Sequence, residues 1–221
     1  MKKILIYSIG RCGSTFYALQ LRKTIDFLDQ DICWHADNKD IDWSLPIHHT
    51  HNFTMLKEAP SDFIRVHATR SILDCAVSKF IAEFTGSYHI FSEADREKYL
   101  SEFQNKKFKI DVKHFVFYVL GIYNEFVEAQ KLFNEFNGEK YMLYYDVHAH
   151  DTILMFQTLK LSIDSNFQVI GNPIQVFPID KFCLIENLDE MLDAYKSLRF
   201  EFDQYDLNTI SKVEKILENK N

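Results

Sequence analysis

The sequence predicts an α/β fold, a three-layer sandwich with a mainly parallel central sheet, formed as a single domain over residues 1–221. Three observations lead to this expectation. Short apolar runs alternate along the chain with longer segments of helical spacing, as in sheets whose strands are joined by crossover helices. The first run leads directly into a glycine turn and a helical segment, which is the opening of a βαβ unit. The chain shows no internal repeat and no linker that would divide it.

Four short segments have the character of buried strands. The run Ile4–Ser8 is almost entirely apolar, as expected for a parallel strand that is covered on both faces. The segment Asp62–Thr69 alternates and is rich in β-branched residues. The other two predicted strands are Pro46–Thr50 and Lys140–Tyr145.

Helical spacing of apolar residues predicts the segments between and after these strands. The longest is Asp111–Phe136, whose apolar stripe is typical of a helix that packs on a core. In the first helix, the apolar positions are Phe16, Leu19, Ile25 and Leu28. The remaining predicted helices are Phe16–Leu28, Phe53–Ala59, Ile72–Phe84, Glu93–Phe103, Asp151–Leu161, Asp180–Leu198 and Leu207–Asn219.

Composition excludes several classes of protein. Apolar residues make up 47% of the 221 residues and aromatic residues 15%, which is too much for a disordered chain. The net charge of −7 argues against a nonspecific nucleic-acid coat, which needs a basic face. A pocket can still be locally positive on an acidic protein, so an anionic ligand stays possible.

The sequence also gives expectations about location and metals. No apolar run is long enough for a transmembrane helix, and the run after Met1 ends too soon for a signal peptide. The cysteines form no CxxC pair, so neither zinc nor a dithiol centre is indicated, and we expect no metal. Free thiols and the absence of a leader favour the cytoplasm. The cysteines are Cys12, Cys33, Cys75 and Cys183.

The turn after the first strand is the most informative segment. Gly10 and Gly13 let the backbone turn sharply and approach a ligand, and the helix that follows offers unpaired N–H groups with partial positive charge. Arg11 adds a full charge, so we expect a phosphate-binding loop here. The alternative is an ordinary turn with a helix cap and an exposed arginine. The motifs GxxxxGK[ST] and GxGxxG are absent, and so is a cysteine followed by an arginine at phosphatase spacing.

The turn resembles the phosphosulfate-binding turn of the sulfotransferases that use 3′-phosphoadenosine-5′-phosphosulfate (PAPS), whose pattern is [KR]-[SG]-G-[ST]-[ST]. A cysteine stands here where serine is usual. The resemblance implies that these residues bind the 5′-phosphosulfate and that Phe16 corresponds to a tryptophan that stacks on the base. The matching residues are Arg11, Cys12, Gly13, Ser14 and Thr15.

A second match to this family follows the third predicted strand. In the family, an arginine at the strand end and a serine eight residues later hold the 3′-phosphate. Arg70 and Ser78 have this spacing, and Asp74 also agrees, whereas Ser71 and Ile72 replace the usual acidic residue and proline. The alternative is a solvated arginine and a serine on a helix surface.

Two further matches are weaker. His51 follows Thr50 where many relatives carry their catalytic base, and an imidazole can take a proton at neutral pH. A structural role for His51 and a metal site in the cluster of His48, His49 and His51 stay open, although alternation sends His48 to the opposite face. Reserve candidates for the base are His35, Asp37 and Asp40.

Tyr145, after the fourth strand, matches a tyrosine that lies against adenine in the family, and packing is the alternative. The family's C-terminal Arg-Lys-Gly loop is not recognisable. Phe177 and Lys181 lie in the region where a replacement is expected.

The resemblance implies in-line transfer of a sulfuryl group from PAPS to a hydroxyl or amine, without a metal. Arg11 and His51 would be the catalytic residues. The alternative is a non-catalytic nucleotide- or phosphate-binding module on the same fold. A kinase-like P-loop enzyme would need the lysine that this turn lacks. The acceptor, whether small molecule, glycan or lipid, and the oligomeric state are left open.

Overall fold

The computed structural model describes residues 2–28, 30–35, 41–86, 93–103, 105–162 and 180–219. The chain forms two compact units. The first, called the sheet unit, comprises Met1–Arg70 and Asn124–Pro173. The second, called the helical unit, comprises Ser71–Tyr123 and Ile174–Asn221. The expectation of a single domain over residues 1–221 stays a prediction.

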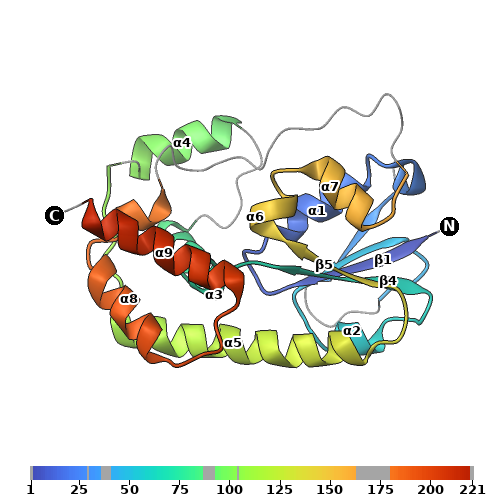
Figure 1. Ribbon diagram of the computed structural model, residues 1–221. Coiled ribbons are helices and arrows are strands. Elements are labelled where there is room, and N and C mark those ends of the chain that lie inside the picture. Colours follow the sequence, from blue (N-terminus) through green and yellow to red (C-terminus); the bar gives the residue numbers. More distant parts are fainter. Residues whose placement is uncertain are drawn as a thin grey trace. The chain divides into compact units, whose positions relative to one another are not determined.

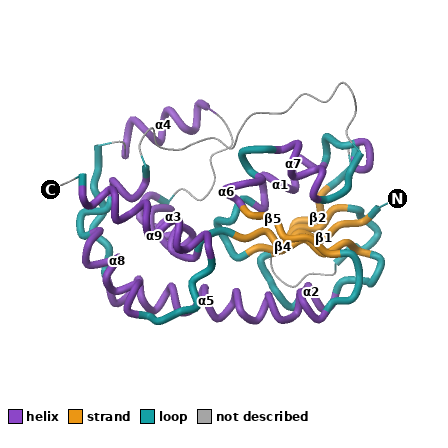
Figure 2. Tube along the Cα trace, viewed as in Figure 1, coloured by secondary structure: helices purple, strands orange, loops and turns teal. Residues whose placement is uncertain are grey.

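The sheet unit contains a five-stranded sheet in the order β2-β3-β1-β4-β5. Every pair of neighbouring strands is parallel, which confirms the predicted α/β class (Figures 1 and 2). Four of the strands match predicted segments, and β2 was not predicted. The strands are β1 (Lys3–Ser8), β2 (Ile32–His35), β3 (Ile47–Thr50), β4 (Phe63–Thr69) and β5 (Lys140–Tyr144).

Helices cover both faces of this sheet, as a three-layer arrangement requires (Figure 1). One face carries α1 (Ser14–Leu21), α6 (Tyr145–His148) and α7 (Thr152–Thr158). The other carries α2 (Met55–Glu58) and the second half of α5 (Val112–Glu135). Because both faces are covered, the residues from Ile4 to Ser8 are all buried.

The first helix is shorter than predicted, and its buried side differs from the predicted one. It ends at Leu21, where the hydroxyl of Thr24 donates to the Leu21 carbonyl, and a 3₁₀ turn, η1 (Ile25–Phe27), follows. The expected stripe was wrong in part, because Ile25 and Leu28 are 57% and 59% exposed. The core under α1 is formed instead by Tyr17, Ala18 and Leu21 with Ile4, Ile6, Ile47 and Val66.

Two basic side chains of β4 lie on the sheet face opposite α1. Arg65 is 2% exposed, and its guanidinium group donates to the carbonyls of Leu56, Ala59, Pro60 and Phe63 while stacking on Phe136. His67 is fully buried among Tyr7, Phe126 and Phe133. Burial lowers the pKa of His67 to about 4, so this imidazole is neutral in the folded protein at pH 7.

The helical unit is organised around a buried carboxylate. Asp206 accepts hydrogen bonds from the hydroxyls of Ser71 and Tyr195 and from the backbone N–H of Ile72, at the start of α3. Burial raises the pKa of Asp206. The elements of this unit are α3 (Ile72–Thr85), α4 (Glu93–Phe103), the first half of α5, η2 (Lys181–Leu184), α8 (Leu188–Ser197) and α9 (Gln204–Glu218). Among the described residues, no helix has the length and apolar character needed to cross a membrane.

Candidate functional site

The turn between β1 and α1 has an unusual backbone geometry. Arg11 and Gly13 both have a φ of 76°, which is the left-handed region and is unusual for arginine. Gly13 is the N-cap residue of α1, and because glycine has no side chain it cannot cap the N–H groups of the first turn. The first hydrogen bond of the helix is donated by the N–H of Tyr17 to the Gly13 carbonyl. The N–H groups of the first turn therefore have no helical acceptor and can serve a ligand.

The position of this turn in the sheet also favours ligand binding. β1 lies in the sheet between β3 and β4. After β1, the chain forms β2 and β3 on one side of it and then crosses to form β4 on the other side, so the direction of strand addition reverses at β1. Ligands of open parallel sheets bind at such a reversal, at the carboxyl ends of the strands. The turn follows β1 at this edge, and Arg70 follows β4 at the same edge.

Arg70 and Tyr145 meet the turn directly. The Nη1 of Arg70 donates to the Arg11 carbonyl at 3.4 Å, and its guanidinium carbon lies 4.1 Å from the centre of the Tyr145 ring. The same ring packs on Gly13 so closely that a Cβ there would clash with it. The structure thus brings together Arg11, Gly13, Arg70 and Tyr145, which the sequence singled out separately.

Hydroxyl and imidazole groups form a second part of the site. The Ser14 Oγ lies 2.6 Å from the Ser8 Oγ and 2.7 Å from the Nε2 of His49. The Nδ1 of His51 lies 2.8 Å from the Ser8 carbonyl oxygen. Because a carbonyl only accepts, that nitrogen carries a proton, and the Nε2 of a neutral His51 holds the lone pair. His51 is exposed, so its Nε2 can accept a proton from a substrate.

His51 also lines an open pocket of about 510 Å³. Two of the other lining residues, Glu125 and Glu128, are carboxylates from the second half of α5. Glu125 accepts a hydrogen bond from the hydroxyl of Tyr7, and burial together with this carboxylate raises the pKa of Tyr7.

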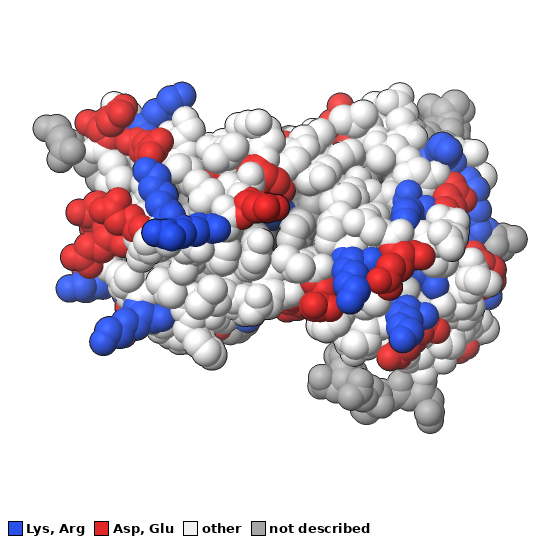
Figure 3. All heavy atoms as spheres, turned by 60° about the horizontal axis from the view of Figure 1, so that its bottom comes forward, with Lys and Arg blue, Asp and Glu red and all other residues white. Residues whose placement is uncertain are grey.

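On the right-hand side of Figure 3, Lys and Arg side chains alternate with Asp and Glu, so the described residues on this drawn face form no continuous basic band.

The side chains of the remaining turn residues are less exposed to solvent. Cys12 is 1% exposed and Ser14 is 2% exposed, so both side chains face the interior. Phe16 is partly buried against the core under α1, and Thr15 is also partly buried. A stacking role for Phe16 on a base stays a prediction.

Ser78 belongs to α3 in the helical unit, and its cooperation with Arg70 stays a prediction. Within that unit, the ammonium group of Lys181 donates to the Ser78 hydroxyl and forms an ion pair with Asp74 at 2.7 Å. Lys181 is therefore close to the serine expected to hold the 3′-phosphate. Phe177, Asp37 and Asp40 lie outside the described residues.

Sequence reasoning missed two residues next to the turn. His49 was considered only as part of a histidine cluster, yet it contacts Ser14 and is 5% exposed. Tyr17 is fully buried, and its hydroxyl has no hydrogen-bond partner among the described residues. Burial raises the pKa of Tyr17, and the positive charge of Arg70 opposes this effect. Strand alternation placed His49 on one face with His51, but the contact of His49 with Ser14 depends on how α1 packs.

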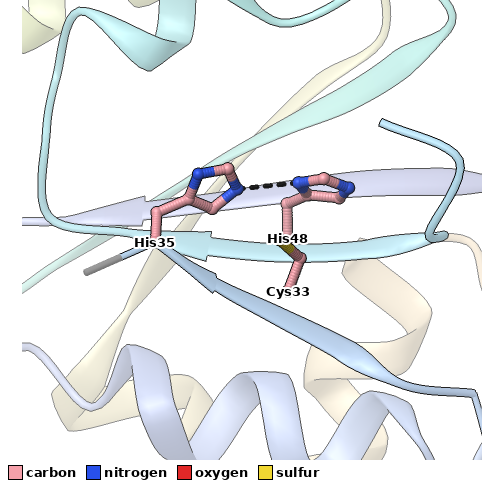
Figure 4. Close-up of side chains that lie close together, drawn as sticks. All are labelled: Cys33, His35 and His48. Carbon is pink, nitrogen blue, oxygen red and sulfur yellow. Dashed lines mark hydrogen bonds between the residues drawn. The ribbon is translucent and has the colours of Figure 1, made fainter. Parts of the chain in front are cut away.

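His35, a reserve candidate for the base, lies elsewhere in the sheet unit. It contacts His48 on the two strands β2 and β3 (Figure 4). The candidate site therefore consists of the turn after β1, Arg70, Tyr145 and the pair His49 and His51. No family model matches the chain, and no curated protein or solved structure matches it either.

Proposed function

We propose that this protein is a PAPS-dependent sulfotransferase that transfers a sulfuryl group to a hydroxyl or amine. The observation that carries the proposal is the contact of Arg70 with the turn at Arg11 and with Tyr145. The guanidinium group of Arg70 thereby contacts the backbone of the turn that carries Arg11, at the reversal point of the sheet. A nucleotide with two phosphates is suited to a site that offers two cationic side chains.

The turn would hold the 5′ end of the nucleotide. Backbone N–H groups of Gly13, Ser14 and Thr15 are suited to the 5′-phosphate, because the first turn of α1 leaves them without helical acceptors. Arg11 would neutralise charge on the bridging oxygen as the S–O bond to the phosphate breaks. The leaving group is 3′,5′-ADP.

Arg70 would bind the 3′-phosphate, which distinguishes PAPS from ATP. The role of Ser78 in the same task rests on its spacing from Arg70 in the sequence. Within the helical unit, the ammonium group of Lys181 contacts the Ser78 hydroxyl and forms an ion pair with Asp74.

His51 would act as the general base. As a new S–O or S–N bond forms, the proton of the acceptor passes to the Nε2 of His51, whose Nδ1 is anchored on the Ser8 carbonyl. The acceptor would enter the pocket that His51 shares with Glu125 and Glu128. The pocket residues do not identify the acceptor. The two carboxylates favour an acceptor that carries hydrogen-bond donors.

Thermal melting with a panel of nucleotides tests the cofactor. 3′,5′-ADP is expected to raise the melting temperature clearly more than 5′-ADP or AMP, because it alone carries the 3′-phosphate. Transfer of labelled sulfate from PAPS to a mixed panel of acceptors then tests catalysis. Equal stabilisation by all three nucleotides, or none by any of them, would refute PAPS as the donor.

A second candidate function is a non-catalytic nucleotide- or phosphate-binding module. One observation favours it: Arg70 covers the Tyr145 ring and Gly13 packs on it, so adenine would have to displace a contact to stack there. This alternative predicts stabilisation by the nucleotide without any sulfate transfer from PAPS.

A further inference from the structure

Three side chains of types that can bind a metal come together on strands β2 and β3. Strand alternation places His48 on the opposite face of β3 from His49 of the candidate site. In the parallel register of these strands, Cys33 is paired with His48. His35 lies two residues after Cys33, so strand alternation puts both on the same face. The Cys33 Sγ and a ring nitrogen of each histidine all lie within 4.8 Å of one another (Figure 4). Sequence spacing argued against a metal site, but this register brings the thiol to the imidazoles.

The hydrogen bonds orient the two imidazoles as ligands. The Nε2 of His48 lies 3.0 Å from the Leu45 carbonyl oxygen, so this nitrogen carries the proton and Nδ1 holds the lone pair. That Nδ1 lies 2.7 Å from the Nε2 of His35. An imidazole anchored on a backbone carbonyl through its other nitrogen is the usual outer-shell arrangement of a metal-bound histidine. The hydrogen bond between the Nε2 of His35 and the Nδ1 of His48 places one proton between these nitrogens, and a bound cation would take the place of that proton.

His48 is buried, and Cys33 and His35 are partly buried. Burial lowers the pKa of His35 and lowers that of His48 to about 4. Burial and the carboxylate of Asp42 raise the pKa of Cys33. Trp43 stacks on the His48 ring at 4.8 Å and covers one side of the cluster.

We propose that Cys33, His35 and His48 bind one Zn²⁺ ion in this protein. One thiolate and two imidazoles match the ligands that zinc prefers, whereas Mg²⁺ and Ca²⁺ require oxygen ligands. Three protein ligands leave one tetrahedral position for water or an external group. Binding replaces the thiol proton of Cys33, and the His35 proton moves to its other ring nitrogen or to solvent. The ion would link edge strand β2 to β3.

The test uses the full chain, stripped of metal with a chelator and titrated with Zn²⁺ in the absence of nucleotide. Calorimetry is expected to give one ion per chain with a Kd below about 1 µM, and Trp43 fluorescence should change with the same stoichiometry. Substitution with Co²⁺ should produce a thiolate-to-metal absorption band. Mg²⁺ should produce none of these effects. Because no nucleotide is present, failure here leaves the sulfotransferase proposal untouched.

Matched variants locate the ion. Cys33→Ser and His35→Asn replace partly exposed side chains with others of similar size, and each should weaken Zn²⁺ binding by at least about 100-fold while circular dichroism stays unchanged. Cys33→Ser should also abolish the cobalt absorption band. The controls Cys183→Ser, another partly exposed free thiol, and His114→Ala, an exposed histidine, should retain wild-type affinity. Weak binding by the wild-type chain, or binding that Cys33→Ser and His35→Asn leave unchanged, overturns the proposal.

Discussion

Arg70 stacks on Tyr145, with its guanidinium carbon 4.1 Å from the centre of the ring. The two residues come from different strands: Arg70 follows β4, and Tyr145 follows β5. Their contact holds the arginine over the turn, where it donates to the Arg11 carbonyl. A guanidinium group held in this way loses little further freedom when it binds an anion, which favours a preorganised site.

Substitution of Gly13 tests the packing that builds this site. In Gly13→Ala, the new Cβ would clash with the Tyr145 ring, and the φ of 76° would be strained for alanine. We expect the free energy of unfolding to fall by about 1–3 kcal/mol and the stabilisation by 3′,5′-ADP to disappear. Urea unfolding and thermal melting measure the two effects.

Gly10→Ala is the matched control for this substitution. No atom lies within 4 Å of a Cβ at Gly10, so its effect on stability should stay within about 0.5 kcal/mol. If Gly10→Ala proves as harmful as Gly13→Ala, the contact with Tyr145 is not the cause.

Much of this arrangement could be predicted from the sequence, because its parts are local. β1, the turn and the start of α1 follow one another in the chain, so apolar residues and glycines suffice to identify them. The sequence also predicts that Arg70 lies near the turn, because Arg70 and the turn each follow a parallel strand and the carboxyl ends of such strands lie at the same edge of the sheet. Its contact with Tyr145 depends on side-chain packing, which no sequence pattern encodes.

The parts that were missed depend on long-range pairing. β2 spans only Ile32–His35 at the edge of the sheet and is too short to show a periodicity. Its pairing with β3 brings Cys33 to His48, which are unrelated in any sequence motif. Arg65 is one of the polar positions in the alternating segment Asp62–Thr69. Only the fold supplies the four carbonyls to which its guanidinium group donates.

Arg70→Lys separates the shape of the cation from its charge. Lysine keeps the positive charge but loses the planar group that stacks on Tyr145 and that can bind a phosphate through two nitrogens. We expect the Kd for 3′,5′-ADP to rise at least about 10-fold and the Kd for 5′-ADP to change little. Calorimetry measures both constants. Arg22→Lys serves as the control, because Arg22 is the C-cap of α1, at the end of that helix opposite the turn. Equal weakening of the two nucleotides would argue against a role at the 3′-phosphate.

Arg65→Met tests the buried guanidinium group. The substitution fills similar space but leaves the carbonyls of Leu56, Ala59, Pro60 and Phe63 without this donor. We expect the free energy of unfolding to fall by about 3 kcal/mol or more, as measured by urea unfolding. Arg65→Lys should recover only part of this loss, because an ammonium group has three donors and cannot serve all four carbonyls. A neutral effect of Arg65→Met would mean that water replaces the lost donors.

His67 makes the stability of the fold depend on pH. The ordinary pKa of 6.5 falls to about 4 in the folded protein because the ring is buried. Between these values the unfolded chain binds a proton that the folded chain does not, so the free energy of unfolding decreases as the pH falls from about 6.5 to about 4. The full contribution of this shift is roughly 3 kcal/mol.

His67→Leu should remove this contribution. Both ring nitrogens of His67 lack a hydrogen-bond partner among the described residues, so leucine should cost little at pH 7. Urea unfolding at about pH 7 and pH 4.5 should show an acid-induced loss that is smaller than in the wild type by about 2–3 kcal/mol. The exposed His114→Leu control should keep the wild-type dependence, and an unchanged dependence in His67→Leu would contradict the assignment.

His51→Ala distinguishes the base from its neighbour His49. The Nε2 of His51 is free to accept a proton because its Nδ1 bonds the Ser8 carbonyl, whereas the Nε2 of His49 contacts Ser14. We therefore expect His51→Ala to lower kcat for sulfate transfer by at least about 100-fold and to leave the Kd for 3′,5′-ADP unchanged. His49→Ala should instead weaken nucleotide binding, because it removes a partner of Ser14 in the turn. If His51→Ala keeps a wild-type kcat while His49→Ala loses it, the proton is accepted by His49, and the pocket beside Glu125 is not the acceptor site.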